Sequence, residues 1–272
     1  MKKTVLITGA SAGIGKATAK YFNEQGWNVV ATMRTPQNET ELNQLDNVVV
    51  ERLDVLELDS IKTAVANTIA KFGKIDVVVN NAGYGAYGPL EAFDRESIAR
   101  QFNTNVIGLL DVTKAVLPHF RENHDGMFIN ISSIGGKITF PLGSLYHGTK
   151  FAVEGISESL SYELENIGAK VKIVEPGAIA TDFAGRSFDF KSGGDELPQY
   201  KQYVDTIMQA VERMMGESSP ASVVAQVIYE AATDGTDRLR YTAGPDAIQY
   251  VNSRKELSDD ELKANMKQAL GL

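Results

Sequence analysis

The chain has 272 residues, 43% of them hydrophobic, with 27 Lys and Arg against 35 Asp and Glu, a net charge of −8, and no cysteine. This length fits one or two domains, and a single α/β domain often reaches about 250 residues. The missing cysteines exclude disulfides, thiolate metal ligands and a thiol nucleophile. An acidic chain without a basic stripe is unsuited to nucleic acid, so we expect no nucleic-acid partner.

The first residues imitate the start of a secretory signal, because Lys2 and Lys3 precede the apolar run Val5-Leu6-Ile7. That run stops at Thr8 and is too short for the roughly 7–15 apolar residues of a signal core. No segment approaches the roughly 18 apolar residues that a membrane helix needs. We therefore expect a soluble cytoplasmic protein with no membrane partner.

The first part of the chain alternates short β-branched segments with longer helical patterns. Apolar residues between Leu58 and Ile69 recur at spacings of three and four, which is typical of a helix. Val77-Val78-Val79 shows no alternation, as in a strand that is buried on both faces. The pattern predicts strands at 4–8, 28–33, 47–52 and 75–80, and helical segments at 15–25, 39–45 and 57–72.

The same alternation continues to about residue 175. It predicts helices at 95–121 and 146–166 and strands at 127–132 and 171–175. Farther on, a helix at 221–232 and a strand near 239–242 complete the sheet, and Ser258 caps a final helix. Repeated strand, helix, strand units imply right-handed crossovers, and therefore a parallel sheet of about seven strands with helices on both faces.

Residues 183–218 interrupt this alternation. A hinge of Ser192, Gly193 and Gly194 leads into a helical pattern rich in aromatic and methionine residues. The segment contains Phe183, Phe188, Phe190, Tyr203, Ile207, Met208, Val211 and Met214. It suits a movable lid over an apolar pocket, and the alternative is an ordinary peripheral helical hairpin. We expect one domain over 1–272, with 183–218 as an inserted lid and 246–272 as a C-terminal tail with a helix.

A glycine-rich turn joins the first strand to the first helix, with Gly9, Ser11, Gly13, Ile14 and Gly15. In a doubly wound sheet this turn presents backbone N–H groups and a helix N-terminus to a pyrophosphate. Its spacing is G-x-x-x-G-x-G and differs from the G-x-G-x-x-G fingerprint of dinucleotide-binding folds. The position of the turn, more than its spacing, favours a nucleotide cofactor.

The end of the second strand bears on which nucleotide is bound. An acidic residue there accepts a hydrogen bond from the ribose 2′-OH of NAD, whereas an arginine accommodates the 2′-phosphate of NADP. This strand ends at Met33 and Arg34 without a carboxylate, which favours NADP(H), with NAD(H) as the alternative. Arg34 can also be a solvated loop residue, and Ala12 leaves the glycine turn without a second basic side chain.

Asn81, Ala82 and Gly83 follow the fourth strand. Strand order is expected to reverse there, and ligand crevices form at such a point. The same residue types also form ordinary turns, so the motif alone does not decide between the two interpretations.

Tyr146 and Lys150 stand four residues apart near the start of a predicted helix and therefore share one face. The pair alone is not diagnostic, because chance can produce it in a chain with ten tyrosines. An ammonium beside a phenol favours the phenolate, so we expect the Tyr146 pKa to fall from about 10 toward the working pH. Such a phenol suits a general acid or base. Ser133, just past a strand end, can hydrogen-bond a carbonyl oxygen or can be a turn residue.

Together these motifs resemble those of the short-chain dehydrogenase/reductase family in its core-length form. The resemblance covers roughly residues 3–245, and the motifs occur in the order of the family. They are Thr8-Gly9 with Gly13-Ile14-Gly15, Asp54-Val55, Asn80-Asn81-Ala82-Gly83, Asn105, Ser133, Tyr146 with Lys150, and Pro176-Gly177. The resemblance implies a Rossmann-type doubly wound α/β fold and an NAD(P)-dependent oxidoreductase acting on CH–OH or C=O groups.

The resemblance also implies a role for each matched residue. Tyr146 would pass a proton to the substrate oxygen, and Lys150 would lower its pKa and hold the nicotinamide ribose. Ser133 would orient the carbonyl, and Asn105 would anchor a water in the proton relay. The others would bind the cofactor: Gly9, Ser11, Gly13, Ile14, Gly15 and Arg34 at the phosphates, Asp54 and Val55 at the adenine, Asn81, Ala82 and Gly83 in the cleft, and Pro176, Gly177, Ile179 and Thr181 at the carboxamide.

The segments 31–34 and 174–177 look like the branch near hydroxysteroid and retinol dehydrogenases and ketoreductases. This implies a small-molecule substrate, an apolar carbonyl or a secondary alcohol, and an NADPH-dependent reductase that is reversible as an alcohol dehydrogenase. In the family the helices expected at 95–121 and 146–166 commonly pair subunits, so a dimer or tetramer is implied. His147 and Glu175 stand at positions that vary in the family.

Two alternatives stay open at this point, and a third is excluded. One is an NAD-preferring dehydrogenase of the same family, and another is an NADP-binding redox sensor without turnover, against which Ser133, Tyr146 and Lys150 argue. A nucleotide-sugar epimerase would want a G-x-x-G-x-x-G loop and a larger C-terminal domain, and the chain has neither. The three histidines, His119, His124 and His147, form no ligand cluster in the sequence, so we expect no metal.

Overall fold

The computed structural model describes residues 2–181, 187–216 and 218–272, and within them one large parallel sheet. Its seven strands are β1 (Thr4–Ile7), β2 (Asn28–Met33), β3 (Val48–Arg52), β4 (Val77–Asn80), β6 (Met127–Ile131), β7 (Lys170–Pro176) and β11 (Arg240–Ala243). Their order, β11-β7-β6-β4-β1-β2-β3, confirms the doubly wound Rossmann-type α/β fold. The order reverses between β1 and β4, which pair with Val5 opposite Val77. A ligand crevice is expected there, beyond the carboxyl ends of the strands.

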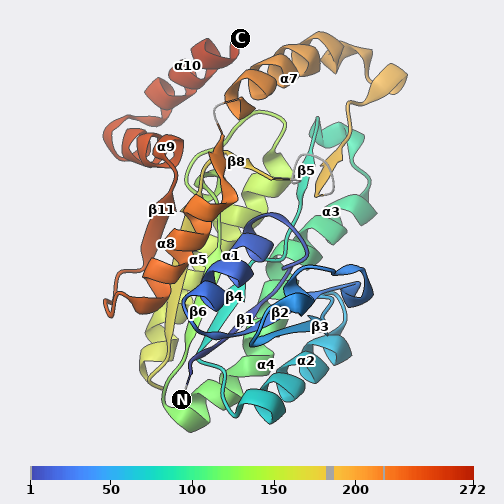
Figure 1. Ribbon diagram of the computed structural model, residues 1–272. Coiled ribbons are helices and arrows are strands. Elements are labelled where there is room, and N and C mark those ends of the chain that lie inside the picture. The colour runs from blue at the N-terminus through green and yellow to red at the C-terminus, as the bar shows by residue number, and fades with distance from the viewer. Residues whose placement is uncertain (1, 182–186, 217) are drawn as a thin grey trace.

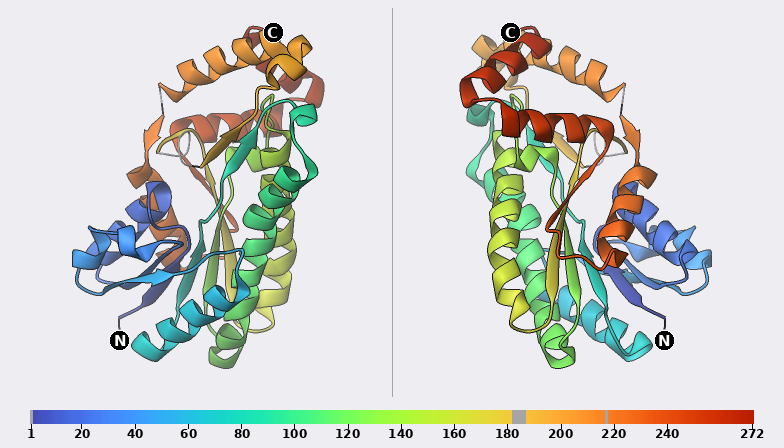
Figure 2. Two further views of the ribbon diagram at one scale, coloured as in Figure 1. Left: turned by 90° about the vertical axis from the view of Figure 1, so that its right-hand side faces the viewer. Right: turned by 90° about the vertical axis from the view of Figure 1, so that its left-hand side faces the viewer.

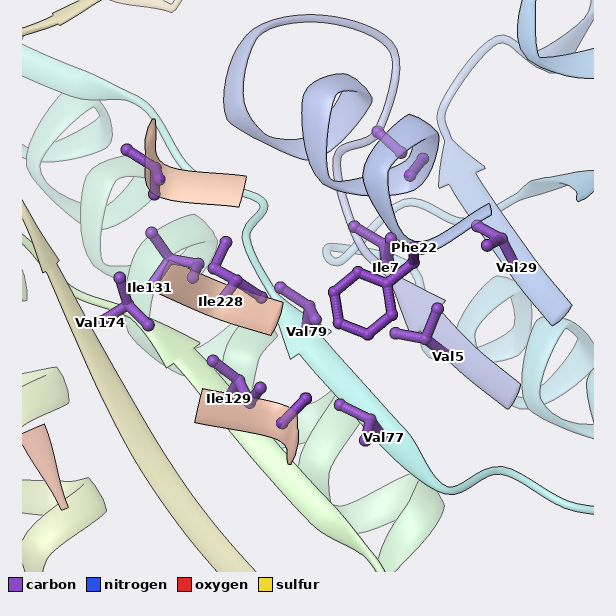
Figure 3. Close-up of a cluster of buried hydrophobic side chains, with 14 of the residues drawn as sticks. Val5, Ile7, Phe22, Val29, Val77, Val79, Ile129, Ile131, Val174 and Ile228 are labelled. Atoms are coloured by element: carbon purple, nitrogen blue, oxygen red, sulfur yellow. The ribbon is translucent and has the colours of Figure 1, made fainter. Parts of the chain in front are cut away.

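Helices cover both faces of this sheet (Figure 1). Helices α1 (Gly13–Glu24) and α8 (Ala221–Thr233) pack on one face, and α2 (Leu58–Phe72), α4 (Gly108–Asn123) and α5 (Ser144–Glu165) pack on the other. Successive strand residues point to opposite faces, so Val77 and Val79 belong to the first apolar cluster and Val78 to the second. Figure 3 shows the first cluster, in which the Phe22 ring of α1 lies beside Val5.

A second layer lies beyond the carboxyl ends of the strands (Figures 1 and 2). It contains helices α7 (Lys201–Met215), α9 (Pro245–Glu256) and α10 (Asp259–Leu270) and the short strand β9 (Phe188–Phe190), which pairs with β5 (Gly85–Tyr87). Leu270 of α10 is buried against Ile207 and Ala210 of α7. We call β9, α7, α9 and α10 the cover. A second short pair, β8 (Ile179–Ala180) with β10 (Ser219–Pro220), joins it to the main sheet region.

Most predicted elements are confirmed within a few residues, and Ser258 caps α10 as expected, in a capping box with Glu261. The helical segment predicted around 39–45 is confirmed only as one 3₁₀ turn, Leu42–Gln44, and another 3₁₀ turn, Pro36–Asn38, precedes it. The physical reason is local, because the Glu39 carboxylate accepts the backbone N–H groups of Glu41 and Leu42 and competes with helical hydrogen bonds.

The helix predicted over 95–121 is not one continuous rod. Helix α3 (Arg95–Phe102) is followed by a π-helical turn, Asn103–Ile107, and only then by α4. At the start of α4 the Gly108 backbone packs so tightly that a Cβ there would lie 2.7 Å from Val55 Cβ. Wide turns of this kind are often found at functional sites, and this one carries Asn105.

The end of the chain also differs from the prediction. The segment 246–272, expected as a tail with one helix, forms two helices, α9 and α10, that belong to the cover. Of the predicted lid, 182–186 with Phe183 lie outside the described residues, and its movement stays a prediction. In the ranges that the structure describes, no helix is both long and apolar enough to cross a membrane.

Candidate active site

A cavity of about 900 Å³ opens between the glycine turn and the cover, and nearly all the predicted site residues line it. They are Gly9, Ser11, Gly13, Ile14, Arg34, Asp54, Val55, Asn81, Ala82, Gly83, Ser133, Tyr146, Lys150, Pro176, Gly177, Ile179 and Thr181. Two predicted residues, Gly15 and Asn105, lie behind the cavity wall. Segments far apart in the sequence therefore converge on one site.

The glycine turn has the shape that an anionic ligand needs. Gly9 and Gly13 have φ values of +68° and +53°, a conformation that side chains disfavour. A Cβ on Gly15 would lie 2.5 Å from both Asn81 Nδ2 and Gly9 O, so Gly15 is a packing residue. Ala12, the N-cap residue of α1, has no side-chain oxygen to bind the first-turn N–H groups. Those groups are available to a pyrophosphate.

Asn81 holds this turn against the end of β4. Its Nδ2 donates to the carbonyl oxygens of Thr8 (2.9 Å) and Gly9 (3.0 Å). In return the Thr8 hydroxyl accepts the N–H groups of Asn81 and Ala82, both at 3.0 Å. The four hydrogen bonds join β1 to β4 at the point where strand order reverses. Asn81 thus positions the backbone of the crevice.

The opposite end of the crevice is formed by Arg34 after β2 and Asp54 after β3. Arg34 is exposed and makes no ion pair with any described residue. The two carboxylates that follow it in the chain are occupied, since Lys16 Nζ lies 3.2 Å from Glu39 and 2.9 Å from Glu41. The guanidinium is therefore available for an anionic group in the crevice.

Tyr146, Ser133 and Lys150 meet in the middle of the cavity wall. Tyr146 and Lys150 stand on successive turns of α5, and the Ser133 side chain lies close enough to the Tyr146 phenol to lower its pKa. Nζ of Lys150 lies 5.6 Å from the centre of the Tyr146 ring and donates to the carbonyl oxygen of Ile131 at 2.9 Å. The predicted catalytic group is thus assembled without any ligand.

The expected fall in the Tyr146 pKa is wrong for the chain as described. Burial disfavours the phenolate and raises the pKa of Tyr146 to about 12, against a smaller lowering by the Ser133 hydrogen bond. Burial also lowers the pKa of Lys150 to about 8. The ammonium beside the ring does not outweigh desolvation, so Tyr146 is protonated at neutral pH, which is the form of a proton donor.

Asn105 does not line the cavity, and its side chain holds the backbone of Tyr84. Its Oδ1 accepts the N–H of Tyr84 at 3.0 Å, and its Nδ2 donates to the Tyr84 carbonyl (2.8 Å) and to Thr149 Oγ1 (3.1 Å). Both Nδ2 hydrogens are used in this way. A relay water anchored at Asn105 would therefore have to bind the backbone of the π turn or the remaining lone pair of Oδ1.

His147 is a site residue that the sequence did not assign. Its Nδ1 lies 2.9 Å from the Gly135 carbonyl, and its Nε2 accepts the N–H of Phe140 at 3.0 Å, which fixes a neutral ring with the proton on Nδ1. Burial lowers the His147 pKa. A Cβ on Gly143 would lie 2.6 Å from the ring. His147 thereby shapes the loop that forms one wall of the cavity.

Tyr87 was also missed. Its ring centre lies 5.3 Å from that of Tyr146 and 5.1 Å from that of Phe188, which in turn stacks on Phe190 at 5.9 Å. Tyr87 and Phe188 come from the β5–β9 pair, whose strands are about a hundred residues apart in the sequence. No local pattern signals such a row of rings leading outward from the catalytic phenol.

Asp246, at the start of α9, is the third missed residue. Its Oδ2 accepts the N–H of Ala178 at 2.7 Å, and a Cβ on Gly177 would lie 2.2 Å from that oxygen. The loop after β7, which the family resemblance places at the nicotinamide, is therefore held by the C-terminal part of the chain. Pro245 at the first helical position marks the start of α9 but gives no hint of this contact.

The far end of the cavity is apolar and is formed by the cover together with the loop that precedes α5. Its lining there consists of Phe140, Leu142, Ile207, Met208, Val211 and Leu270. This part suits the apolar body of a substrate, whereas the glycine turn and Arg34 suit a dinucleotide. In the described ranges no three His, Asp or Glu side chains are arranged to hold a metal ion.

Comparisons with known proteins agree with this geometry. Residues 3–192 match the short chain dehydrogenase family. An uncharacterized oxidoreductase of Schizosaccharomyces pombe is 45% identical over 240 residues, which are 88% of this chain and 100% of that protein. The 3-ketodihydrosphingosine reductase of Bacteroides thetaiotaomicron is 39% identical over 208 residues, 76% of this chain and 74% of that one.

Solved structures are similar over nearly the whole chain. A short-chain dehydrogenase from Streptomyces avermitilis has a TM-score of 0.83 at 30% identity and covers 98% of this chain, with 96% of its own length matched. ElxO, solved with NADP bound, has a TM-score of 0.75 at 28% identity, with 92% and 100% covered. A 3-ketoacyl-(acyl-carrier-protein) reductase from Brucella melitensis, solved with NADH, has a TM-score of 0.73 at 25% identity, with 89% and 97% covered.

The relatives thus include proteins solved with either nicotinamide cofactor. The matched family spans more than half of the chain, and the matched range includes the glycine turn, Ser133, Tyr146 and Lys150. The chain therefore belongs to the short-chain dehydrogenase/reductase family and is an NAD(P)-dependent oxidoreductase.

Proposed function

We propose that the protein is an NADPH-dependent reductase of ketones and aldehydes with an apolar body, reversible as an alcohol dehydrogenase. The observation that carries this proposal is the position of Tyr146. It stands where the dinucleotide crevice meets the apolar part of the cavity, with Ser133 and Lys150 beside it in the cavity wall. A carbonyl with an apolar body can reach both regions only at this junction.

In this function Tyr146 is the proton donor. With a pKa of about 12 it keeps its proton at neutral pH and releases it only as negative charge develops on the substrate oxygen. Ser133 orients that oxygen, and the Lys150 ammonium stabilises the phenolate that remains. The reduced nicotinamide, when bound, supplies the hydride. Asp246 and Asn81 act at a distance by fixing the backbone of the crevice.

The preference for NADPH over NADH rests on Arg34. Its guanidinium is exposed at the crevice, and the described residues offer it no carboxylate partner. A 2′-phosphate would receive charge-assisted hydrogen bonds from such a group. NAD(H) is the alternative cofactor.

The substrate class follows from the apolar end of the cavity. It is supported by the similarity to a 3-ketodihydrosphingosine reductase, whose name describes a ketone substrate. From that similarity we infer only that the substrate of this chain carries a carbonyl group and an apolar body. The apolar end of the cavity has room for a bulky hydrocarbon group.

A homo-oligomer, dimer or tetramer, is part of the same proposal. Phe102, Ile107 and Phe151 are 37%, 47% and 44% exposed on α3, the π turn and α5, which pack together. Exposed apolar side chains on adjoining helices are typical of a surface that pairs with a second copy.

The experiment that tests the function is an absorbance screen of ketones and aldehydes with NADPH and NADH in parallel. We expect oxidation of NADPH by apolar ketones and slower oxidation of NADH. Tight NADPH binding without oxidation by any carbonyl would instead support a redox sensor. A clear preference for NADH would remove the role given to Arg34.

A further inference from the structure

A pair of buried carboxyl groups lies behind the catalytic wall and outside the cavity. Glu154 follows Lys150 by one turn of α5, and Glu175 stands near the end of β7, just before Pro176. Glu154 is 5% exposed and Glu175 1% exposed. Neither lines the cavity, and the mechanism above uses neither. Buried carboxyl groups are costly to keep, so their presence needs a physical reason.

The two carboxyl groups share one cation. Arg240 Nε lies 2.9 Å from Glu154 Oε2 and 3.7 Å from Glu175 Oε1, and its Nη2 lies 2.5 Å from Oε2 of the more exposed Glu158. Lys137 is the other cation that acts on Glu175. Arg240 and Lys137 supply two positive charges against three carboxylates, two of which are buried. The charge balance therefore favours a proton on one member of the buried pair.

Hydrogen bonding points to the same conclusion. Oε1 of Glu154, Oε1 of Glu175 and Oγ of Ser132 are buried and have no hydrogen-bond partner in the described part of the chain. These three oxygens can all accept hydrogen bonds, but the Ser132 hydroxyl is the only one of them that can also donate when both carboxyl groups are ionised. A proton on one carboxyl group supplies a second donor. Burial and the neighbouring Glu154 carboxylate raise the pKa of Glu175. The proton is thus assigned to Glu175 and the charge to Glu154.

This cluster touches the catalytic residues through Gly136. A Cβ on Gly136 would lie 2.7 Å from Ser132 Oγ, 2.9 Å from Glu154 Cγ and 3.0 Å from the Lys150 carbonyl. The three groups therefore converge on one glycine. Ser132 is also the neighbour of Ser133, so the carboxyl pair lies directly behind the residues that act on the substrate.

Lys150 needs a nearby negative charge. Burial disfavours its ammonium, and Glu154 is the charged side chain that opposes this effect within the described residues. The other groups facing Lys150 are neutral, namely the Ile131 carbonyl of β6 and the Tyr146 ring. Without the Glu154 charge, the lysine would lose its proton more easily.

We propose that Glu154 and Glu175 form a buried acid pair that shares one proton and one negative charge, and that this charge holds Lys150 in its ammonium form. Both are positioning residues, because they act through Lys150 and do not touch substrate or cofactor. The proposal rests on the proposed function for the role of Lys150.

Glu154→Gln tests the charge. The variant keeps the shape of the side chain. Glu175 then ionises more easily, but it lies on β7 and is not among the groups that act on Lys150. We therefore expect the alkaline limb of the kcat profile, and that of NADPH affinity, to move down by about one pH unit. Glu158→Gln is the matched control, since it removes a carboxylate from the same guanidinium at the surface, and it should leave both limbs in place. An equal loss at every pH, without a shifted limb, would overturn the proposal and show a structural role.

Glu175→Gln tests the proton. A neutral amide replaces a protonated acid, so the alkaline limb should stay where it is in the unchanged chain. In the unchanged chain, protonated Glu175 contributes its full stability below pH about 4.5, and this contribution is lost as the pH rises through the raised pKa of Glu175. The free energy of unfolding of the variant should not show this loss. A limb shifted as far as in Glu154→Gln would place the charge on Glu175 and overturn the assignment.

The two proposals fail in different ways. If no carbonyl is reduced by the unchanged chain, the proposed function fails. NADPH affinity against pH and thermal unfolding against pH still decide the acid pair, because neither measurement needs turnover. An unchanged affinity limb in Glu154→Gln together with an unchanged unfolding profile in Glu175→Gln would overturn the acid pair even in an active enzyme.

Discussion

The cofactor crevice and the cover are built in different ways. The crevice comes from consecutive strand and helix units, and its glycine turn, residues 9–15, is a local feature that spans the end of the β1–α1 connection and the first turn of α1. The cover depends on contacts between distant segments, such as Asp246 with Ala178, 68 residues apart, and Arg100 with Asp189, 89 apart. The glycine turn and the Tyr146–Lys150 pair are thus each encoded in one short stretch of sequence, although Asn81 also joins the crevice to Thr8, 73 residues earlier. The cover side of the cavity has no comparable local motif and depends on long-range packing.

The sharpest test of this division is Tyr146→Phe. The change removes the proton donor from the junction of the two regions and leaves the crevice intact. Turnover should fall by about 10²–10⁴, the usual contribution of a general acid, while the Kd for NADPH stays within a few-fold. Tyr162→Phe, an exposed tyrosine of the same helix, is the control. Turnover like that of the unchanged chain in Tyr146→Phe would sink the mechanism.

The second test concerns the crevice alone. Arg34→Ala should weaken NADPH binding by about 10-fold to 100-fold, which corresponds to losing charge-assisted hydrogen bonds of about 1.5–3 kcal/mol. NADH has no 2′-phosphate, so its affinity should change little. Arg52→Ala, at the end of the adjacent strand and paired with Glu57, is a matched surface control. Equal losses for the two cofactors would remove the 2′-phosphate assignment.

The sequence predicted the crevice well for physical reasons. The members of each motif are close along the chain, Gly9 to Gly13 and Tyr146 to Lys150. The periodicity of apolar residues predicts the strands and helices that carry these motifs. The π turn at Asn105 was missed because the apolar spacing of a helix continues through it. The direction of the Tyr146 pKa shift was wrong, since the burial that raises it is a property of the assembled fold.

The site residues in and beside the cover could not be predicted in the same way. Tyr87 pairs through β9, and Asp246 acts on a loop 68 residues earlier, so no window of sequence contains both partners. His147 stood beside the predicted Tyr146, but its partners Gly135 and Phe140 carry no pattern of their own. Residues of this kind become visible only when tertiary contacts are known.

A third test changes a residue of the cover and asks whether the crevice is affected. Leu270 is 1% exposed, lines the cavity and packs on α7, so Leu270→Ala should enlarge the apolar end. We expect kcat/KM for a substrate that fills this end to fall about 5-fold, which corresponds to about 1 kcal/mol, the low end of the range for one apolar group lost from a hydrophobic pocket. Affinity for NADPH should not change. Leu272→Ala, 44% exposed, controls for the change in composition.

The opposite outcome for Leu270→Ala is equally informative. If NADPH affinity falls as much as kcat/KM, the cover supports the crevice as a structural unit. The two regions would then not be separable, and Asp246 at the start of α9 is the contact through which such coupling would pass.

The smallest expected effect concerns the wall between the two regions. His147 is held neutral, with its pKa lowered mainly by burial, so the unfolded chain takes up a proton first as pH falls below about 6.5. The stability that neutral His147 provides is present above that pH and is lost as pH falls through the lowered pKa. His147→Gln can donate to Gly135 and accept from Phe140 without titrating. Between pH 7 and pH 5 the Tm of this variant should therefore fall less than the Tm of the unchanged chain, and we expect the two falls to differ by a few degrees at most. His119 is present in both proteins, so its contribution cancels in the comparison. Identical declines in Tm would show that the fold does not keep the His147 ring neutral.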